Sequence, residues 1–435
     1  MLKGNTKIQL FDAVSGDEVQ CIEKHNMITN AVNKLVSPPL DYLLMNSSIS
    51  YYTCLNDCMP LSENGLAGIL LWEDTIEENA DIVMPDFNNK IIGHAGSAYS
   101  GTDPYRGNFN TNESGDIING KRFVWDFGTD KANGTISAVS LTSLAGGNCS
   151  IGGTIDNLDC FSYFSDFFSL PGYRCTAEIA PNLFVYYSLS GSTLTLMYQQ
   201  LEKSTELHYK HTPTSSSLIK TVTVNLPFSP NSEKIFTDEN GLMHFIQYTS
   251  STRTLQYCTI NVETGAIVDN QSVTIGSLPD TFKTTWEPTA VYGGYIYGGG
   301  ESNNSDSYRY SCVVHALDGS FIKADTETTF NSLSYSFDTS GVVNGALLLR
   351  NDILIKGLNF IKGKWFLGNA RYGMKIVYTY RNIYPYVLGA RHSSNYDYVY
   401  LIKFNPYIGS INNLTTPVVK TNAQTMKITY EVTEV

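Results

Sequence analysis

Alternation of apolar and polar residues predicts a β-hairpin at the start of the chain, followed by a helix. Residues 6–11 and 18–22 alternate with a period of two, and Ser15-Gly16-Asp17 between them are turn residues. In residues 26–36 the apolar positions instead follow the spacing of one helical face. The helix is expected to end at Ser37-Pro38-Pro39, because proline disfavours helical backbone in the residue before it.

Further strands are predicted in the first 150 residues and at the end of the chain. The apolar run 66–72 suits a buried strand, and residues 123–127 and 135–141 alternate. Asn133-Gly134 is typical of a hairpin turn, so the two alternating segments around it are expected to pair. Residues 425–432 also alternate, and we expect this strand to return and pair with strands of the first domain.

Beyond about residue 160, helical periodicity nearly disappears, and a repeat of strand, tight turn and strand takes its place. The turn positions lie 49, 54, 44 and 46 residues apart, and a further strand pair precedes each unit. This is the size of a propeller blade, so the pattern predicts a propeller-like domain of about five blades. An array of β-sandwiches is the alternative. The turn positions are Ser216, Gly265, Gly319, Gly363 and Gly409.

The composition narrows the possible partners and compartments. The 435 residues carry a formal net charge of −12 and no long basic run, so we expect no nucleic-acid partner, since a phosphate backbone is bound by clustered Lys and Arg. No segment approaches the ~20 apolar residues that span a bilayer, and the start lacks the apolar core of a secretory signal, so we expect synthesis in the cytosol and no membrane span. Eight cysteines are too few for a disulfide scaffold, and they form no zinc-ligand set.

Short segments near both ends of the chain carry a family resemblance. They include KGNTKIQL at 3–10, HNMITNA at 25–31, GNFNTNESG at 107–115, FVWDF at 123–127, and the segments 15–17, 132–136, 141–143, 412–421 and 426–430. These segments resemble tail-associated structural proteins of phages and prophages of Gram-positive gut bacteria. The resemblance covers about residues 1–150 and 405–435, and the middle carries no family signature. It implies a virion protein of the tail, baseplate or fibre, made in the host cytoplasm, that contacts other tail proteins and forms a homo-oligomer in the particle.

The sequence contains no catalytic motif, and we assign no catalytic or metal-ligating residue and no cofactor. The glycine-rich run 292–300 lacks the lysine and the following helix of a phosphate-binding loop, so a strand entering a turn is the simpler interpretation. Acidic residues within 73–78 lack the spacing of an EF-hand calcium loop. Turn chemistry by itself explains acids such as Asp238 and Glu239. Carboxylates that could converge for glycoside hydrolysis are Asp159, Asp166, Asp238, Glu239, Glu287, Asp306 and Asp352.

Residues 384–400 offer a binding hypothesis, because sugar rings stack on aromatic faces while polar side chains satisfy their hydroxyls. Rim loops without any ligand are the alternative, so no binding residue is assigned. The residues that suggest binding are Tyr384, Arg391, His392, Asn395, Tyr396, Asp397, Tyr398 and Tyr400.

The sequence therefore predicts a mostly β protein of two parts. Residues 1–150, joined by 412–435, form a β-rich attachment domain with one short helix. Residues 160–411 form the propeller-like domain, displayed toward a host-surface glycan or another tail protein. We expect attachment and recognition without a chemical reaction. The alternatives are a propeller-type glycan hydrolase or depolymerase that acts during adsorption, and a purely architectural collar or baseplate decoration.

Overall fold

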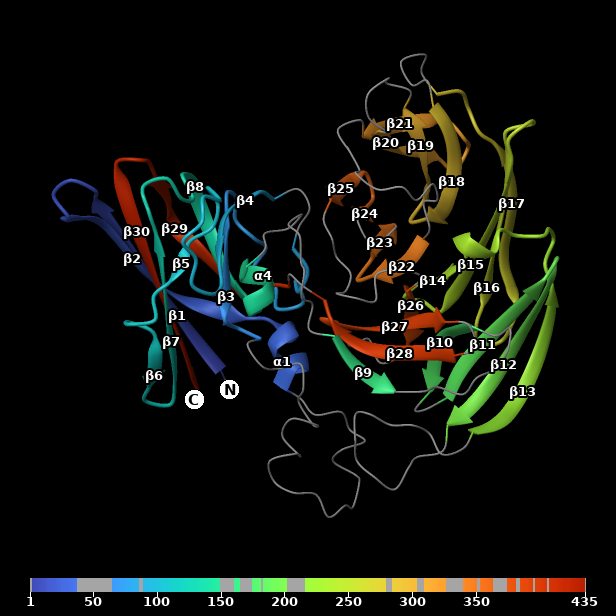
Figure 1. Cartoon of the computed structure of the whole chain (residues 1–435), viewed down its shortest axis with the longest axis horizontal. Coiled ribbons are helices and arrows are strands. Elements are labelled where there is room, and N and C mark those ends of the chain that lie inside the picture. The colour runs from blue at the N-terminus through green and yellow to red at the C-terminus, as the bar shows by residue number, and fades with distance from the viewer. Residues whose placement is uncertain are drawn as a thin grey trace.

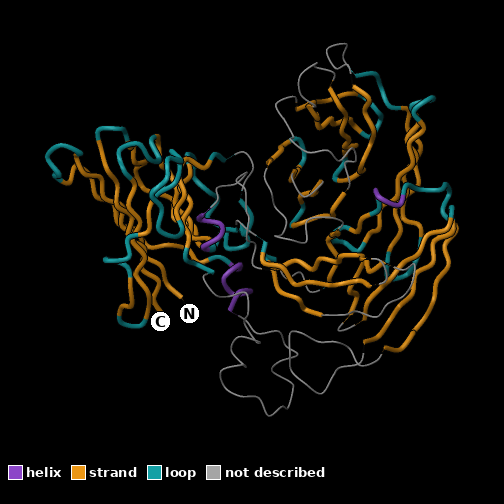
Figure 2. Tube along the Cα trace, viewed as in Figure 1, coloured by secondary structure: helices purple, strands orange, loops and turns teal. Residues whose placement is uncertain are grey.

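The structure is a computed structural model, and the regular secondary structure of its described residues is almost all β-strand (Figures 1 and 2). The two ends of the chain form one large sheet, and the middle of the chain forms four others. Within the described residues, no helix has the length and apolar character that a membrane crossing requires. The described residues are 2–36, 65–85, 89–148, 160–164, 174–180, 183–201, 216–278, 284–302, 309–325, 339–349, 353–362, 374–380, 384–393, 396–404 and 407–434.

Both ends of the chain build the first part, which we call the terminal module (residues 2–148 and 407–434). Its sheet has the order β4-β3-β8-β29-β2-β1-β30-β7-β5, with β6 paired to β7. A bridge between His94 and Arg106 joins the β4 edge to the chain just before β5, so the sheet curls into a nearly closed barrel. The strands are β1 (Leu2–Asp12), β2 (Glu18–Ile28), β3 (Gly68–Trp72), β4 (Ile91–Ala95), β5 (Asn108–Phe109), β6 (Gly115–Ile117), β7 (Gly120–Phe127), β8 (Gly134–Thr142), β29 (Ser410–Lys420) and β30 (Gln424–Glu434).

The C-terminal strand β30 is an interior strand of this sheet, between β1 and β7. It pairs with β1 from Leu2–Glu434 to Asp12–Gln424, and it pairs with β7 on its other side. Every second residue of β30 from Met426 to Val432 is buried, as the alternation requires of a strand with one face in a core. One core cluster joins these side chains to Trp125 of β7 and Leu71 of β3. The two ends of the sequence therefore share one core.

The helix predicted over residues 26–36 was wrong in its first residues. The helix α1 covers Asn30–Val36, while residues 26–28 continue β2. The reason is that Asn26 pairs with Gly4, and Met27 pairs with Ile411 of β29. A second short helix, α4 (Leu144–Asn148), follows β8.

The expected hairpin around Asn133-Gly134 was also wrong, although both of its strands exist. Strand β7 pairs with β30, β5 and β6, whereas β8 pairs with β3 and β29. Four strands, β29, β2, β1 and β30, lie between β7 and β8 in the sheet. Asn133-Gly134 indicates a turn of the local backbone. The partners of β7 and β8 are instead the strands with which they complete the core.

The middle of the chain is inserted between β8 and β29, which are neighbours in the sheet of the terminal module. Its described residues form three separate four-stranded sheets and one eight-stranded sheet. The eight-stranded sheet consists of two four-stranded halves, which join where Ala177 and Glu178 pair in parallel with Tyr378 and Thr379. Successive sheets stand around a common centre (Figure 1). This is a β-propeller, and the predicted fold class is confirmed.

Within the described residues the propeller has five four-stranded units, numbered by the chain order of their first strands, and β9, which precedes unit 1 in the chain, is the fourth strand of unit 5. Unit 1 is β10 (Arg174–Ala180), β11 (Leu183–Ser190), β12 (Thr193–Leu201) and β13 (Ser216–Asn225). Unit 2 is β14 (Phe236–Thr237), β15 (Leu242–Thr249), β16 (Thr254–Asn261) and β17 (Ile267–Thr274), after the short 3-10 helix Ser232–Lys234. Unit 3 is β18 (Thr284–Tyr292), β19 (Tyr295–Ser302), β20 (Arg309–Ala316) and β21 (Phe321–Asp325). Unit 4 is β22 (Thr339–Val343), β23 (Ala346–Leu349), β24 (Ile353–Lys356) and β25 (Asn359–Lys362), and unit 5 is β26 (Met374–Thr379), β27 (Tyr386–Ser393), β28 (Tyr396–Lys403) and β9 (Cys160–Phe164).

The sheets of units 2 and 3 bury both of their faces against neighbouring units. On β15, Phe245 packs in a cluster with unit 1, while the next residue, Ile246, packs in a cluster with unit 3. On β19, Ile296 faces unit 2 and Tyr297 faces unit 4. Successive residues of a strand point to opposite faces of the sheet. Because both faces are buried between units, consecutive residues of these strands are apolar.

The predicted repeat units match the hairpins at 257–267 and 311–321, which are β16–β17 and β20–β21. In unit 4 the turn lies at Gly357, between β24 and β25, whereas the predicted position Gly363 is outside the described residues. Gly409 forms no hairpin turn, because it leads directly into β29 of the terminal module. The run 292–300 is the β18–β19 hairpin, with its turn at Gly293-Gly294.

Candidate functional site

A pocket of about 490 Å³ opens where the inner strands β14, β22 and β26 come together. Its lining comes from units 2, 4 and 5: the turn after β14, the turn after β22, and the segment joining β26 to β27. Residues far apart in the sequence meet here, because every unit of a propeller presents its first strand to the common centre. The lining combines carboxylates, amides, tyrosines and aliphatic side chains.

Threonine side chains hold the inner strands together beside this pocket. The hydroxyls of Thr176 and Thr237 lie 2.5 Å apart, and Thr339 donates to the carbonyl of Thr289 at 3.1 Å. All four threonines are buried and come from units 1 to 4. From unit 5, the Lys375 ammonium donates to the carbonyl of Thr339. These bonds fix the backbone on which the lining residues stand.

The turn after β14 supplies two neighbouring carboxylates with different environments. Asp238 is 4% exposed, and its Oδ1 accepts the backbone N–H groups of Asn240 and Leu242. Its Oδ2 lies 3.0 Å from Nε2 of His244, whose ring stacks on Phe236. Both oxygens of this carboxylate therefore already have partners in the chain, as expected of an aspartate that stabilises a turn.

Glu239 is exposed and makes fewer hydrogen bonds than Asp238. Its Oε1 accepts a hydrogen bond of 2.7 Å from the Tyr292 hydroxyl of unit 3. Burial raises the pKa of Tyr292, and the hydrogen bond to Glu239 raises it further, so the phenol stays protonated at neutral pH. The bond links the second and third units at the mouth of the pocket.

Four tyrosines of unit 5 also line the pocket: Tyr378, Tyr380, Tyr384 and Tyr386. Burial raises the pKa of Tyr378 and of Tyr384, which keeps both phenols neutral. The hydroxyl of Tyr384 is buried and has no hydrogen-bond partner in the part of the chain that the structure describes. A buried hydroxyl without a partner costs about 1–3 kcal/mol relative to a satisfied one, so this group lowers the stability of the pocket wall.

The carboxylates weighed from the sequence separate into three groups. Asp238 and Glu239 both lie at the pocket. Glu287 is elsewhere, with a 66% exposed side chain 2.8 Å from the buried Lys234 ammonium. Asp159, Asp166, Asp306 and Asp352 lie outside the described residues. Of the acids in 73–78, Glu73 and Glu78 lie beside Lys90 and Lys24, and among the described residues no group of side chains could hold a metal ion.

The aromatic segment 384–400 contributes Tyr384 and Tyr386 to the pocket. The side chains of its other candidates, from Arg391 to Tyr400, lie outside the described part. Sequence reasoning missed Tyr378 and Tyr380, which precede that segment, and it missed the inner-strand threonines. A threonine three to five residues before the Asn-Gly or Gly-Gly turn of units 2 to 4 is the signal that could have located the inner strands.

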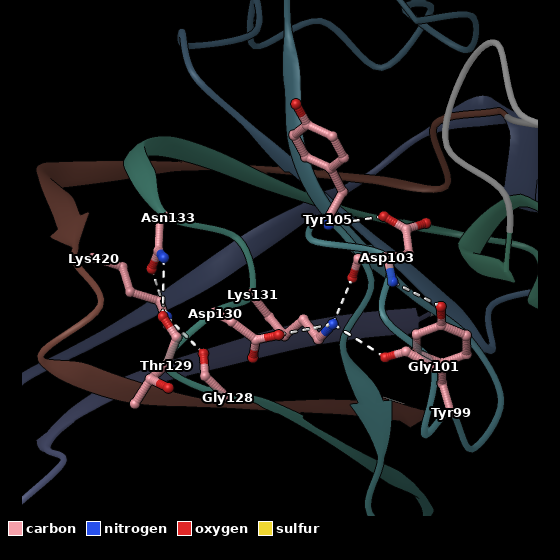
Figure 3. A network of polar contacts seen from close by, with 10 residues as sticks. All are labelled: Tyr99, Gly101, Asp103, Tyr105, Gly128, Thr129, Asp130, Lys131, Asn133 and Lys420. Atoms are coloured by element: carbon pink, nitrogen blue, oxygen red, sulfur yellow. Dashed lines mark hydrogen bonds and ion pairs between the residues drawn. The ribbon is translucent and has the colours of Figure 1, made fainter.

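A second polar cluster, in the terminal module, contains the buried Lys420 and the partly buried Lys131 (Figure 3). Lys420, at the end of β29, donates to the carbonyl of Gly128 and to Oδ1 of Asn133, both at 2.8 Å. Lys131 donates to the carbonyls of Gly101 and Asp103 and lies beside Asp130. Each ammonium is occupied by oxygens of the chain itself. The cluster ties the β7–β8 connection to β29 and to the 99–105 loop, which is a structural role.

Lys420 predicts a pH dependence of stability in the terminal module. Burial lowers its pKa to about 8, while Asp130 opposes the shift. Between this value and the ordinary lysine pKa, the unfolded chain binds a proton that the folded chain lacks. The free energy of unfolding should therefore rise with pH from 8 upward, by at most about 1.4 kcal/mol per pH unit. We expect urea titrations from pH 7 to 9.5, followed by hydrogen exchange of residues 120–142, to show this rise.

Lys420→Met provides the comparison for that measurement. It removes the titrating group and leaves the oxygens of Gly128 and Asn133 without their donor, so stability at pH 7 should fall by about 1–3 kcal/mol. The difference between the two proteins should then change with pH. A pH profile of Lys420→Met parallel to that of the unchanged protein would refute this account.

The fold places this chain among proteins with a β-propeller, here inserted into a β-rich terminal module. No protein-family model matches the sequence, and no curated protein matches it. Among solved structures, a prolyl endopeptidase from a study of inter-domain dynamics in two such enzymes is similar, with 11% identity and a TM-score of 0.20, over 81% of this chain and 50% of that chain. The β-propeller domain of the Trilobed protease from Pyrococcus furiosus is similar with 7% identity and a TM-score of 0.20, over 71% of this chain and 96% of that domain.

This chain spans half the length of the prolyl endopeptidase it matches. At these identities and TM-scores the likeness transfers neither a site nor an activity.

Proposed function

We propose that this protein is a structural component of a phage tail, in which the terminal module attaches to the tail assembly and the propeller recognises a host-surface glycan. The observation that carries the proposal is the insertion of the whole propeller between two adjacent strands of one module. Strands β8 and β29 pair from Asn412–Val139 to Lys420–Gly134, so the chain leaves and re-enters the module at one place. The propeller is thus held by two connections.

The resemblance to tail proteins gains support from where its segments lie. They come from the first 150 and the last 31 residues. Strands from the two ends alternate in one sheet, since β30 lies between β1 and β7, and β29 lies between β8 and β2. Segments separated by the entire propeller therefore constitute one folded unit, as expected if that unit is the common attachment part and the insertion is the variable part.

The propeller suits recognition because its pocket combines tyrosine rings with carboxylate and amide groups. Aromatic faces and hydrogen-bonding side chains are the two features that sugar recognition requires. Glycan hydrolysis is the second candidate, because Asp238 and Glu239 both lie at this pocket. We favour binding, since Asp238 is already engaged by two backbone N–H groups and by His244.

The test uses particles of the phage that encodes this chain. We expect the chain in purified particles, with antibodies against the propeller labelling the tail, and we expect the purified full-length chain to compete with particles for adsorption to host cells. Absence from the particles would overturn the tail assignment. Labelling without competition would support architectural decoration, and shortening of host polysaccharide by the purified chain would support the hydrolase.

A further inference from the structure

The pocket at β14, β22 and β26 has a negative charge that no positively charged lining residue neutralises. Its described lining includes the carboxylates of Asp238 and Glu239 and no lysine or arginine. Asp238 is nearly buried and holds its contacts with the chain. Glu239 is exposed, and only one of its carboxylate oxygens is engaged, by Tyr292, within the described part of the chain. One carboxylate oxygen at the pocket mouth thus remains for a ligand.

The same pocket presents aromatic surface next to this charge. Tyr378, Tyr380, Tyr384 and Tyr386 line it, and the Tyr380 residue is 41% exposed. Electron-rich ring faces attract cations as well as the C–H faces of sugars. Asn240 and Asn344 add amide groups that can bind ligand hydroxyls.

We propose that this pocket binds an amino sugar whose amine is free and positively charged. The ammonium group would lie against Glu239, the sugar ring against the tyrosines, and the sugar hydroxyls near Asn240 and Asn344. A neutral sugar would leave the Glu239 carboxylate desolvated and without a counter-charge, which is unfavourable. The volume of about 490 Å³ is within the range of pockets for small ligands. This inference rests on the proposed function, because it names the glycan class that the propeller recognises.

The charge of the ligand gives the experiment its first comparison. Calorimetric titration of the full-length chain with a glucosamine tetramer should show binding, whereas the N-acetylglucosamine tetramer should bind at least about tenfold more weakly, because acetylation removes the ammonium charge. Higher salt should weaken only the glucosamine tetramer. Equal affinity for the two tetramers, or binding of neither, would overturn the proposal. Tighter binding of a lysine-containing peptide than of the glucosamine tetramer would also overturn it, in favour of a protein partner.

Variants then assign the binding to this pocket. Glu239→Gln keeps a hydrogen-bond acceptor for Tyr292 and removes the charge, so affinity for the glucosamine tetramer should fall about tenfold. Asp269→Asn makes the same charge change on the outer strand β17 of the same unit and should leave affinity unchanged. Tyr380→Phe should preserve binding because it keeps the ring, and Tyr380→Ala should weaken it. An unchanged affinity in Glu239→Gln would place any binding elsewhere.

The two proposals can fail separately. A chain that is present in phage tails but does not bind the glucosamine tetramer would overturn only the amino-sugar inference. A chain that binds the tetramer through Glu239 but is absent from particles would overturn only the tail assignment.

Discussion

Replacing Ile428 by alanine is expected to lower the free energy of unfolding of the terminal module by about 2–5 kcal/mol. Ile428 is 0% exposed and lies in the middle of β30. It pairs with Ile8 of β1 on one side and with Trp125 of β7 on the other. The substitution removes buried methyl and methylene groups from a core to which both ends of the chain contribute, and the surrounding sheet can close the cavity only in part.

The adjacent residue provides a matched control. Thr429 stands on the same strand but points to the other face, where it is only half-buried. Thr429→Ala should cost less than about 1 kcal/mol, mainly through the lower strand preference of alanine. Hydrogen exchange of the full chain in urea, read for residues 2–12 and 120–142, separates this module from the propeller. Equal losses in the two variants would contradict the central position of Ile428 in the core.

The second large effect is expected at a glycine between two propeller sheets. Gly319, in the β20–β21 turn, has φ +87°, and a Cβ added there would lie 2.1 Å from the carbonyl oxygen of Thr274 at the end of β17. Its own carbonyl accepts the N–H of Gly276, so the turn of unit 3 is fastened to the edge of unit 2. Gly319→Ala must therefore strain the backbone and separate the units. We expect a loss of about 2–4 kcal/mol in propeller stability.

Gly293→Ala distinguishes the contact from the backbone effect. Gly293 also has a positive φ, of +58°, and lies in the β18–β19 turn of the same unit, but a Cβ there would meet nothing within 4 Å. Its replacement should lower the free energy of unfolding by only about 1 kcal/mol, which is the cost of placing alanine in a left-handed backbone conformation. Thermal unfolding of the full chain monitored by hydrogen exchange of residues 267–278 measures both variants. If Gly293→Ala destabilises the propeller as much as Gly319→Ala, close contact between units is not the cause.

Local pattern predicted most strands of this protein. The first hairpin, the strand at 425–432 and the hairpins β16–β17 and β20–β21 all follow from period-two alternation interrupted by turn residues. The same logic failed at Asn133-Gly134, where two predicted strands exist but do not pair with each other. A turn signal concerns four residues of backbone, whereas the choice of partner depends on which strands complete the core.

The candidate site was only partly accessible from the sequence. Asp238 and Glu239 were noted as turn acids, and Tyr384 as part of an aromatic segment, but nothing in their spacing connects them. They meet because unit 2 and unit 5 both contribute a first strand to the centre of the propeller. The bond between Glu239 and Tyr292 and the engaged state of Asp238 likewise depend on unit-to-unit contacts and turn geometry.

By itself, the sequence determined that this chain is β-rich, that its middle repeats, and that its last strand has one apolar face, because alternation and turn chemistry act over a few neighbouring residues. Only the tertiary structure decided that β29 and β30 enter the sheet of the first strands, that the propeller is an insertion between β8 and β29, and that carboxylates and tyrosines from different units share one pocket. The physical reason is that strand partners and the faces of successive sheets are selected by burial of a common core. The strands that share this core are hundreds of residues apart in the sequence, so a pattern over a few neighbouring residues cannot identify them as partners.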